Sequence, residues 1–415
     1  MFRISTNMPS DAMQYYLRRH EGSLAKVQAQ IAQQTKIAEL RDDPLAASHA
    51  VRYESYLARL DRFEKNTLYA KDHLNQTDSY LRHTGDIMQR IREIAVRSAN
   101  GVYTNEDMRY MGVEVNELLK EIVSVANALG PDGTQLFAGD KAWTEPFRAV
   151  EGTVEGGGER MIVRVEYRGA GSSRRTEIAE GVYADLDIAG GEAFWAEKMQ
   201  IFSPVNATNY RATEEGAFFV DGEKITVTTG DTVQAIIAKI NDSPAPVKAY
   251  LDPQSRGIAL EGTNAHLIRL EDATGSKVLQ DLGVIVGNSE TGAPNWNPQA
   301  QVFGGSAFDM VIRFRDALFR GDPEYIGGQG IMGMDLALSN LESRLVDTGS
   351  RAERAIMAWQ KTNEEIPMVT GALNREMGLD IASAATDLAM LDFAHKTTLQ
   401  VTAKLIPTTL LDFLR

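Results

Sequence analysis

The sequence contains no cysteine among its 415 residues. Without a thiol the chain can form no disulfide, thiolate nucleophile, zinc-thiolate site or iron–sulfur cluster. It also lacks long apolar runs, since stretches such as Ile94 to Val96 are far shorter than a membrane span. Hydrophobic residues make up 43% and charged residues 24%, which are values typical of globular proteins. These absences exclude several enzyme classes and predict no membrane insertion.

Basic residues are scarce relative to acidic ones, because 43 lysines and arginines stand against 57 aspartates and glutamates, for a net charge of -14. An acidic surface repels phosphate backbones and anionic lipid, so we expect no nucleic-acid partner. Residues 1–8 contain no basic segment followed by an apolar core, so no secretory signal peptide is predicted. Two interpretations stay open: a cytoplasmic protein, or cargo of an export machine that uses no cleaved signal.

The first segment of the chain predicts a helix with one apolar stripe. The stripe alternates spacings of four and three residues, as on a coiled-coil seam: Met13, Leu17, His20, Leu24, Val27 and Ile31. A lone histidine on such a seam is more often a register-setting residue than a ligand, so His20 is interpreted as structural. Asp43 is then expected to cap a second helix whose first position is Pro44, where the missing N–H costs nothing.

The second helix is predicted to run from residue 44 to residue 99, because nothing breaks its stripe before Gly101. The stripe consists of Tyr56, Leu60, Phe63, Thr67, Ala70, Leu74, Thr77, Leu81, Thr84, Met88, Ile91, Ala95 and Ser98. At ~1.5 Å per residue this helix would be about 84 Å long and would need neighbouring helices to cover it. A third helix is expected to begin at a capping box formed by Thr104 and Asp107 and to end at Gly130-Pro131. Its stripe is Met108, Met111, Val115, Leu118, Ile122, Val125 and Leu129.

Glycine-rich turns and short alternating runs replace this pattern beyond Gly139. Strands are predicted at residues 161–167, 218–221, 225–228, 247–251, 258–261 and 266–270. Gly222-Glu223 is expected to be the turn of a hairpin, and Asp231 is expected to cap a short helix over residues 232–240.

Helix is predicted to resume at about Ala307 and to continue through the C-terminal part of the chain. Its stripe is Leu345, Thr348, Ala352, Ala355, Trp359, Thr362, Ile366, Val369 and Leu373, and a last segment carries Ile381, Ala384, Leu388, Leu391, His395, Thr398, Thr402 and Leu405. The predicted fold is therefore α+β, with a long antiparallel helical bundle or coiled coil formed by both termini and a central β-rich insert. Residues 1–40 and 375–415 are predicted as terminal coiled-coil segments, residues 41–140 and 305–374 as a helical rod domain, and residues 141–304 as an α+β insert.

Motifs for catalysis or ligand binding give little support for an enzyme. Residues 328–333 fit G-x-G-x-x-G, but no buried strand precedes them, so a flexible linker between helices is the better interpretation. The adjacent carboxylates Asp42 and Asp43 stand at a helix start, which favours capping over metal or acid–base chemistry. The sequence contains no HExxH or G-x-S-x-G motif, and its six histidines are scattered. We therefore predict no catalytic, cofactor or metal residues.

Short motifs at both ends and in the insert form a recognisable set. They are residues 3–7 (RISTN), 42–47 (DDPLAA), 95–96 (AV), 99–101 (ANG), 136–139 (LFAG), 348–351 (TGSR) and 404–414, with 219–222 (FVDG), 230–232 (GDT) and 239–241 (KIN) in the insert. Together they resemble bacterial flagellar axial proteins of the flagellin superfamily, most closely the hook-filament junction proteins of the hook-associated protein 3 type. Pro44 favours the junction proteins, since filament flagellins usually carry alanine and glycine after the two aspartates.

The resemblance implies a structural role without enzymatic activity. The protein would join the hook, through hook-associated protein 1, to the flagellin filament, and would form a ring with copies of itself. It would be exported beyond the cytoplasm with the help of a flagellar export chaperone, and its insert would face outward. We expect subunit-assembly contacts at Ile4, Leu17, Leu24, Ile31, Leu388, Leu391, Leu405, Leu410, Leu411 and Leu414, next to the helix-start motif Asp42, Asp43 and Pro44.

Three alternatives remain open from the residues. One is a flagellin filament subunit, and a more distant one is a secreted adhesin or glycan-binding protein. The latter would need exposed aromatic residues such as Trp195 grouped on one face of the insert, although core positions are the simpler interpretation for Trp195 and Phe194. An enzyme with a site in residues 141–304 would need a deep polar pocket there.

Overall fold

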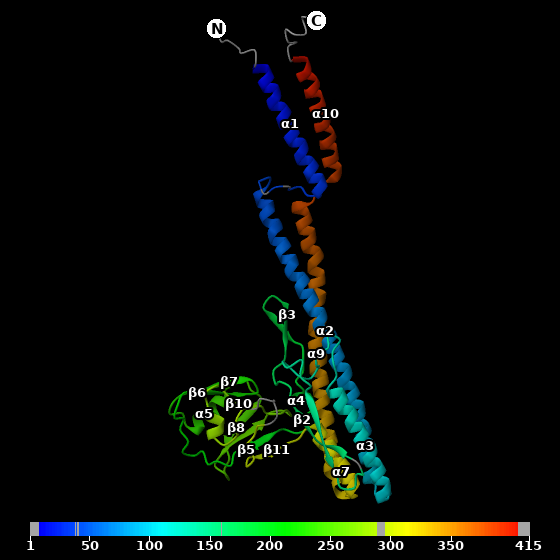
Figure 1. Cartoon of the computed structure of the whole chain (residues 1–415), viewed down its shortest axis with the longest axis vertical. Helices are drawn as coiled ribbons and strands as arrows, with labels where there is room; N and C mark the ends of the chain where they lie inside the picture. The colour runs from blue at the N-terminus through cyan, green and yellow to red at the C-terminus, as the bar shows by residue number, and fades with distance from the viewer. Residues whose placement is uncertain (1–7, 38, 40, 159, 289–294, 406–415) are drawn as a thin grey trace. The chain divides into compact units, whose positions relative to one another are not determined.

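The computed structural model describes residues 8–37, 39, 41–158, 160–288 and 295–405 (Figure 1). The chain divides into two compact units, a terminal unit of residues 1–65 and 359–415 and a central unit of residues 66–358. Helices α2 (Pro44–Ala99) and α9 (Ile331–Met377) each contribute one part to both units. Within the described ranges, no helix is both long enough and apolar enough to cross a membrane.

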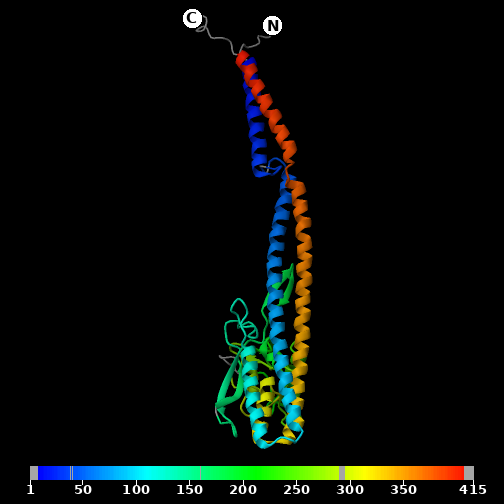
Figure 2. The same cartoon turned by 90° about the vertical axis from the view of Figure 1, so that its right-hand side faces the viewer.

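The terminal unit is built from helices at both ends of the chain. Helix α1 (Met8–Gln33) and helix α10 (Ile381–Leu405) lie side by side and antiparallel (Figures 1 and 2). The first part of α2 pairs with the last part of α9, where the Tyr56 hydroxyl donates to Glu365 Oε2 at 3.0 Å. The predicted antiparallel pairing of the two termini is confirmed.

Helix α2 has the predicted bounds, and its predicted stripe is buried from Leu60 to Ser98, with Tyr56 half-buried. Threonine is tolerated in this stripe because its hydroxyl finds a partner within the helix. Thr77 Oγ1 donates to the carbonyl of His73 at 3.0 Å, and Thr84 Oγ1 donates to the carbonyl of Tyr80 at 3.0 Å. These bonds pair the buried hydroxyls of Thr77 and Thr84, and the short side chains let neighbouring helices approach closely.

Helix α3 (Asn105–Ala126) begins at the predicted capping box, in which Thr104 and Asp107 each accept the other's backbone N–H. It ends at Ala126 rather than at Gly130-Pro131, and the predicted stripe residue Leu129 is exposed. The early end has a tertiary cause, because the Asn127 side chain binds both backbone groups of Phe147, at 2.9 Å to its N–H and 2.7 Å to its carbonyl. Helix α7 (Ala307–Arg320) packs on α3 and starts at the predicted residue, with a second capping box at Ser306.

The insert contains four small antiparallel sheets in the described part of the chain. Strands β1 (Phe147–Thr153) and β2 (Arg160–Tyr167) pair, as do β3 (Arg175–Ala179) and β4 (Val182–Asp185). A three-stranded sheet has the order β10 (Leu270–Asp272), β6 (Gly216–Val220), β7 (Glu223–Val227). A four-stranded sheet has the order β11 (Gln301–Phe303), β5 (Gln200–Phe202), β9 (Ile258–Gly262), β8 (Val247–Leu251). Short helices α4 (Gly190–Ala193), α5 (Val233–Asn241) and α6 (Val278–Asp281) connect these strands.

Three local predictions in the insert were wrong in detail. The β6–β7 turn consists of Asp221 and Gly222, both at positive φ, rather than Gly222-Glu223, since a two-residue turn of this type needs two left-handed positions. Thr232, not Asp231, caps α5 and accepts the N–H of Ala235 at 3.3 Å. The strand expected at residues 266–270 reaches β10 only at its last residue. Strands β1, β3, β4, β5 and β11 were not predicted.

The glycine-rich segment before α9 is also different from the prediction. Residues 328–333 are helical rather than a flexible linker: α8 (Pro323–Tyr325) leads into a π-helical turn, η1 (Ile326–Gly330), which continues directly into α9. Ile326 is fully buried, and Gly330 lies so close to the ring of Phe314 that a larger side chain would press on it. Packing thus fixes a segment whose glycines suggested mobility. The predicted α+β fold class, with helices at both ends and a β-rich insert, is confirmed.

Candidate assembly site and a buried polar network

The seam between α1 and α10 is formed by the predicted stripes of the two helices. On α1 all six stripe residues are half-buried: Met13, Leu17, His20, Leu24, Val27 and Ile31. On α10 the stripe is buried or half-buried at Ala384, Leu388, Leu391, His395, Thr398 and Thr402. Ile381 is the exception, because it is the first residue of α10 and its side chain is exposed.

Five of the predicted assembly residues therefore lie on this seam, namely Leu17, Leu24, Ile31, Leu388 and Leu391. Leu405 is the last residue of α10, and its side chain falls outside the description. Ile4, Leu410, Leu411 and Leu414 lie outside the described residues. Half-burial leaves part of each seam side chain available to a neighbour, so contact with other subunits stays a prediction for this set.

Helix α10 has a second, exposed apolar face that was not predicted from the sequence. Met390 and Phe393 are 63% and 72% exposed, and Val401 is 40% exposed. Together with the exposed Ser383, Thr386 and Thr397 they follow spacings of three and four along one side of the helix without a charged residue. On α1, Tyr15 and Tyr16 are exposed in the same way. In the sequence, α10 carries two stripes, and only the leucine-rich one was predicted as a contact surface.

The helix-start motif joins the end of α1 to the start of α2. Asp43 Oδ1 accepts the N–H groups of Leu45 at 3.2 Å and Ala46 at 3.0 Å, so the predicted N-cap is confirmed. Asp42 has a different role: its carboxylate pairs with Lys26 Nζ of α1 at 2.7 Å. The two adjacent acids therefore have different roles, since Asp43 caps α2 and Asp42 binds α1.

The same joint also contacts the turn between α9 and α10. The N–H of Lys36 donates to the carbonyl of Met377 at 2.7 Å, and Met377 packs on a small core of Ile37, Ala46 and Ala47. Asp380 caps α10 by accepting the N–H of Ala382 at 3.0 Å. The connection between α1 and α2 and the turn between α9 and α10 are therefore held against each other in the terminal unit.

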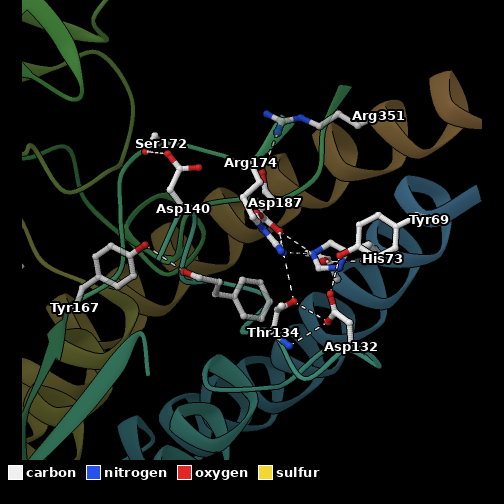
Figure 3. A network of polar contacts seen from close by, with 12 residues as sticks. Tyr69, His73, Asp132, Thr134, Asp140, Tyr167, Ser172, Arg174, Asp187 and Arg351 are labelled. Atoms are coloured by element: carbon white, nitrogen blue, oxygen red, sulfur yellow. Dashed lines mark hydrogen bonds and ion pairs between the residues drawn. The ribbon is translucent and has the colours of Figure 1, made fainter. Parts of the chain in front are cut away.

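The central unit contains a buried polar network that was not predicted from the sequence (Figure 3). At its centre, Asp187 is fully buried and binds an imidazole and a guanidinium. Its Oδ1 lies 2.7 Å from His73 Nε2, and its Oδ2 accepts Arg174 Nε at 2.7 Å. Arg351 of α9 adds a hydrogen bond of 3.2 Å to the backbone carbonyl of Asp187. Burial opposes ionisation of Asp187, but the His73 and Arg174 contacts outweigh it and lower the pKa of this carboxyl.

A second carboxylate extends the network toward the surface. The Tyr69 hydroxyl donates to Asp132 Oδ2 at 2.7 Å, and the Thr134 hydroxyl donates to Asp132 Oδ1 at 2.7 Å. Burial opposes ionisation here too, yet these hydrogen bonds hold the pKa of Asp132 at about 2. The network therefore connects α2 with the loop that follows α3 through a carboxylate that stays ionised at neutral pH.

This network holds elements together, and its histidine is shielded from solvent. His73 is only 2% exposed and its ring nitrogen is committed to Asp187, so a substrate could not reach it. In the part of the chain that the structure describes, no cluster of three or more histidines and carboxylates could hold a metal ion. No local sequence motif predicts this network, because its members are far apart in the sequence. They lie at positions 69 to 73, 132 to 134, 174, 187 and 351.

Comparison with known protein families places two segments of the chain. Residues 4–142 match the model of the bacterial flagellin N-terminal helical region. Residues 4–142 therefore contain a flagellin N-terminal region. Residues 219–264 match the flagellin hook IN motif, and this range contains all three insert motifs singled out in the sequence. The resemblance to the flagellin superfamily is therefore confirmed.

Similar proteins include several flagellins. Flagellin FlaB1 of Treponema pallidum (strain Nichols) is 31% identical over 119 residues, which cover 29% of this chain and 42% of that protein. Flagellin FlaB2 of the same organism is 26% identical over 285 residues, 67% of this chain and 89% of that protein. The chain thus spans less than half the length of FlaB1.

Solved structures that match this chain in a structural comparison include flagellar hook-associated proteins. Hook-associated protein 3 of Legionella pneumophila has a TM-score of 0.45 and 15% identity, over 78% of this chain and 97% of that one. A putative flagellar hook-associated protein of Vibrio parahaemolyticus has a TM-score of 0.47 and 14% identity, over 81% of this chain and 100% of that one.

Proposed function

We propose that this chain is a structural, non-enzymatic subunit of the bacterial flagellum that joins the hook to the flagellin filament and so supports motility. The observation that carries the proposal is the flagellin N-terminal region over residues 4–142, combined with a helical hairpin made from both ends of the chain. Pro44 after two aspartates favours a junction subunit over a filament subunit. The exposed face of α10 supplies what an assembling subunit needs, because it is an apolar surface that the monomer leaves uncovered.

Assembly would use the terminal unit on two sides. The seam residues Leu17, Leu24, Ile31, Leu388 and Leu391 would hold the hairpin and offer their remaining surface to a neighbouring copy. Ile4, Leu405, Leu410, Leu411 and Leu414 would add contacts at the chain ends. Asp42, Asp43 and Pro44 would fix the angle at which α2 leaves this assembly layer, since they join α1 to α2. The insert would face outward.

The partners follow from this position. They would be hook-associated protein 1 on the hook side, flagellin on the filament side and further copies of this chain in a ring. An export chaperone would keep the apolar terminal helices from aggregating before the chain leaves the cytoplasm. The flagellum could be external or periplasmic.

A filament subunit is the second candidate, because the similar proteins FlaB1 and FlaB2 are named as flagellins. Deletion of the gene separates the two functions. Loss of a junction subunit should leave hooks without filaments while flagellin is shed into the medium, and the phenotype should be restored by the wild-type gene. Gold-labelled antibody should mark a single short zone at the hook end. Labelling along whole filaments would support the second candidate, and normal filaments in the deletion strain would refute both.

A further inference from the structure

One face of the four-stranded sheet in the insert carries aromatic and amide side chains. The pairing register places Phe202 opposite Gln301 on one side and opposite Ala259 on the other, and Ala259 opposite Tyr250. Directly opposed residues point to the same face, so these side chains share one surface across all four strands. The other face carries Ile201, Leu260 and Val247 and belongs to the core. At about 4.8 Å between strands, the surface is roughly 14 Å wide.

Three rings form a cluster on this surface. Phe202 stands between Phe303 and Tyr250, with ring centroids 5.8 Å and 6.4 Å apart and planes nearly perpendicular. Ala259 beneath the rings is fully buried, so the rings cover the sheet. Phe303 nevertheless remains 54% exposed on an edge strand. Phe303 is therefore a surface ring rather than a core position, and its face is open to stacking.

Polar side chains border the rings. A pocket of about 380 Å³ is lined by Phe202, Phe303 and residues of two loops. The exposed residues Gln254, Gln299 and Gln301 line it, and the hydrogen bonds recorded for them among the described residues involve their backbones, not their side-chain amides. Asp252 also lines the pocket; the N–H of Ser255, at 2.7 Å, lowers the pKa of its carboxyl and keeps it ionised.

We propose that this face binds a neutral oligosaccharide. A sugar ring presents an apolar C–H surface that stacks on an aromatic ring, and its hydroxyls both donate and accept hydrogen bonds. Side-chain amides match those hydroxyls because each also donates and accepts. The ionised Asp252 disfavours acidic sugars, which it would repel. The pocket thus combines an exposed ring for stacking with polar side chains for hydrogen bonding.

A protein partner fits this surface less well. Protein interfaces cover a central apolar patch of several hundred square ångströms, whereas here glutamines and an aspartate line the same pocket as the rings. The aromatic residue that the sequence suggested for such a face, Trp195, is not part of it, because Trp195 is half-buried against the core. The inference is independent of the junction function, since it concerns the insert alone.

The test uses the purified full chain and four neutral hexasaccharides, built from α-glucose, β-glucose, mannose or N-acetylglucosamine. Saturation-transfer NMR and calorimetry should detect binding of at least one of them. Phe303→Ser should weaken that binding about tenfold, because an exposed stacking ring is lost. Gln301→Ala should weaken it by a smaller factor. Tyr183→Ser is the matched control, since Tyr183 is a comparably exposed ring on β4, and it should leave the affinity unchanged.

Several results would overturn the inference. One is the absence of binding for all four hexasaccharides by wild-type protein whose melting temperature shows that it is folded. Another is an affinity that Phe303→Ser and Tyr183→Ser change equally. A third is light scattering that shows the chain to be oligomeric until Phe303→Ser makes it monomeric, which would assign the face to contacts between copies. Equal melting temperatures for wild type and both serine variants would exclude misfolding as the cause.

Discussion

The imidazole of His73 on α2 lies 2.7 Å from the carboxylate of Asp187, and both side chains are at most 2% exposed. The same carboxylate accepts two hydrogen bonds from Arg174, at 2.7 Å and 2.9 Å. A charge removed from water to this extent is tolerated only because its partners replace the lost hydration. This pair therefore binds α2 to the segment between β4 and α4 within the central unit.

Replacing Asp187 by alanine should strongly destabilise the central unit. The change leaves Arg174 and His73 without their buried partner, and breaking such a pair costs about 3–5 kcal/mol. Denaturant unfolding followed by circular dichroism measures the loss. The control is Glu114→Ala, which removes the exposed ion pair with Arg90 and should cost no more than about 1 kcal/mol. Equal losses for the two variants would contradict the assigned role of the network.

Acid should weaken the contact between α2 and the loop that contains Asp132. The pKa of Asp132 is lowered to about 2 in the folded chain, against about 3.9 in an unfolded one. The stability that comes from this ionised carboxyl is therefore present above about pH 4 and is lost as pH falls toward about 2. A carboxyl-detected NMR titration measures the folded pKa directly.

Tyr69→Phe tests the cause of that lowered pKa. Removing the hydroxyl deletes the donor at 2.7 Å, so the pKa of Asp132 should rise and acid unfolding should begin at a higher pH. Tyr110→Phe deletes a hydroxyl that donates to Glu106 on the exposed surface of α3, and it should leave the Asp132 titration unchanged. An unaltered pKa in Tyr69→Phe would mean that Thr134 alone sustains the shift.

Loss of the cap at Asp43 should loosen the first turn of α2. Asp43→Ala removes the acceptor of two backbone N–H groups, which typically costs about 1 kcal/mol. Hydrogen exchange of the Leu45 and Ala46 amides should accelerate, while exchange in the middle of α2 should not. Asp61→Ala, which removes only an exposed pair with Lys65 on the same helix, serves as the comparison. Unchanged exchange at Leu45 would show that Pro44 suffices to start the helix.

The two faces of α10 should respond differently to substitution. Leu391→Ser acts on the half-buried seam and should lower the melting temperature of the α1–α10 hairpin, because apolar contact is lost. Phe393→Ser acts on an exposed ring, so the folded monomer should melt as before, whereas incorporation into flagella should fall. Thermal unfolding and immunoblots of sheared flagella measure the two effects. Normal motility with Phe393→Ser would remove this face from the proposed assembly surface.

Helical periodicity proved a good guide where one stripe fills a continuous seam. The bounds of α2 and its buried stripe from Leu60 to Ser98 follow from spacing and from the caps around Pro44, all of which are local features. The capping box of Thr104 was visible for the same reason. The end of α3 was not visible, because the hydrogen bonds of Asn127 to Phe147 cross twenty residues of sequence.

The sequence by itself determined the helical ends, the β-rich insert, the absence of thiol chemistry and the flagellin resemblance, because each is written in local spacing or short motifs. Only the tertiary structure brought Tyr69, His73, Asp132, Arg174 and Asp187 into one network, and only strand register put Phe202, Tyr250 and Phe303 on one face. Which of two apolar stripes on α10 is covered was likewise decided by packing. The physical reason is the same in each case: burial and long-range pairing depend on the neighbours that folding supplies, and those neighbours are distant in the sequence.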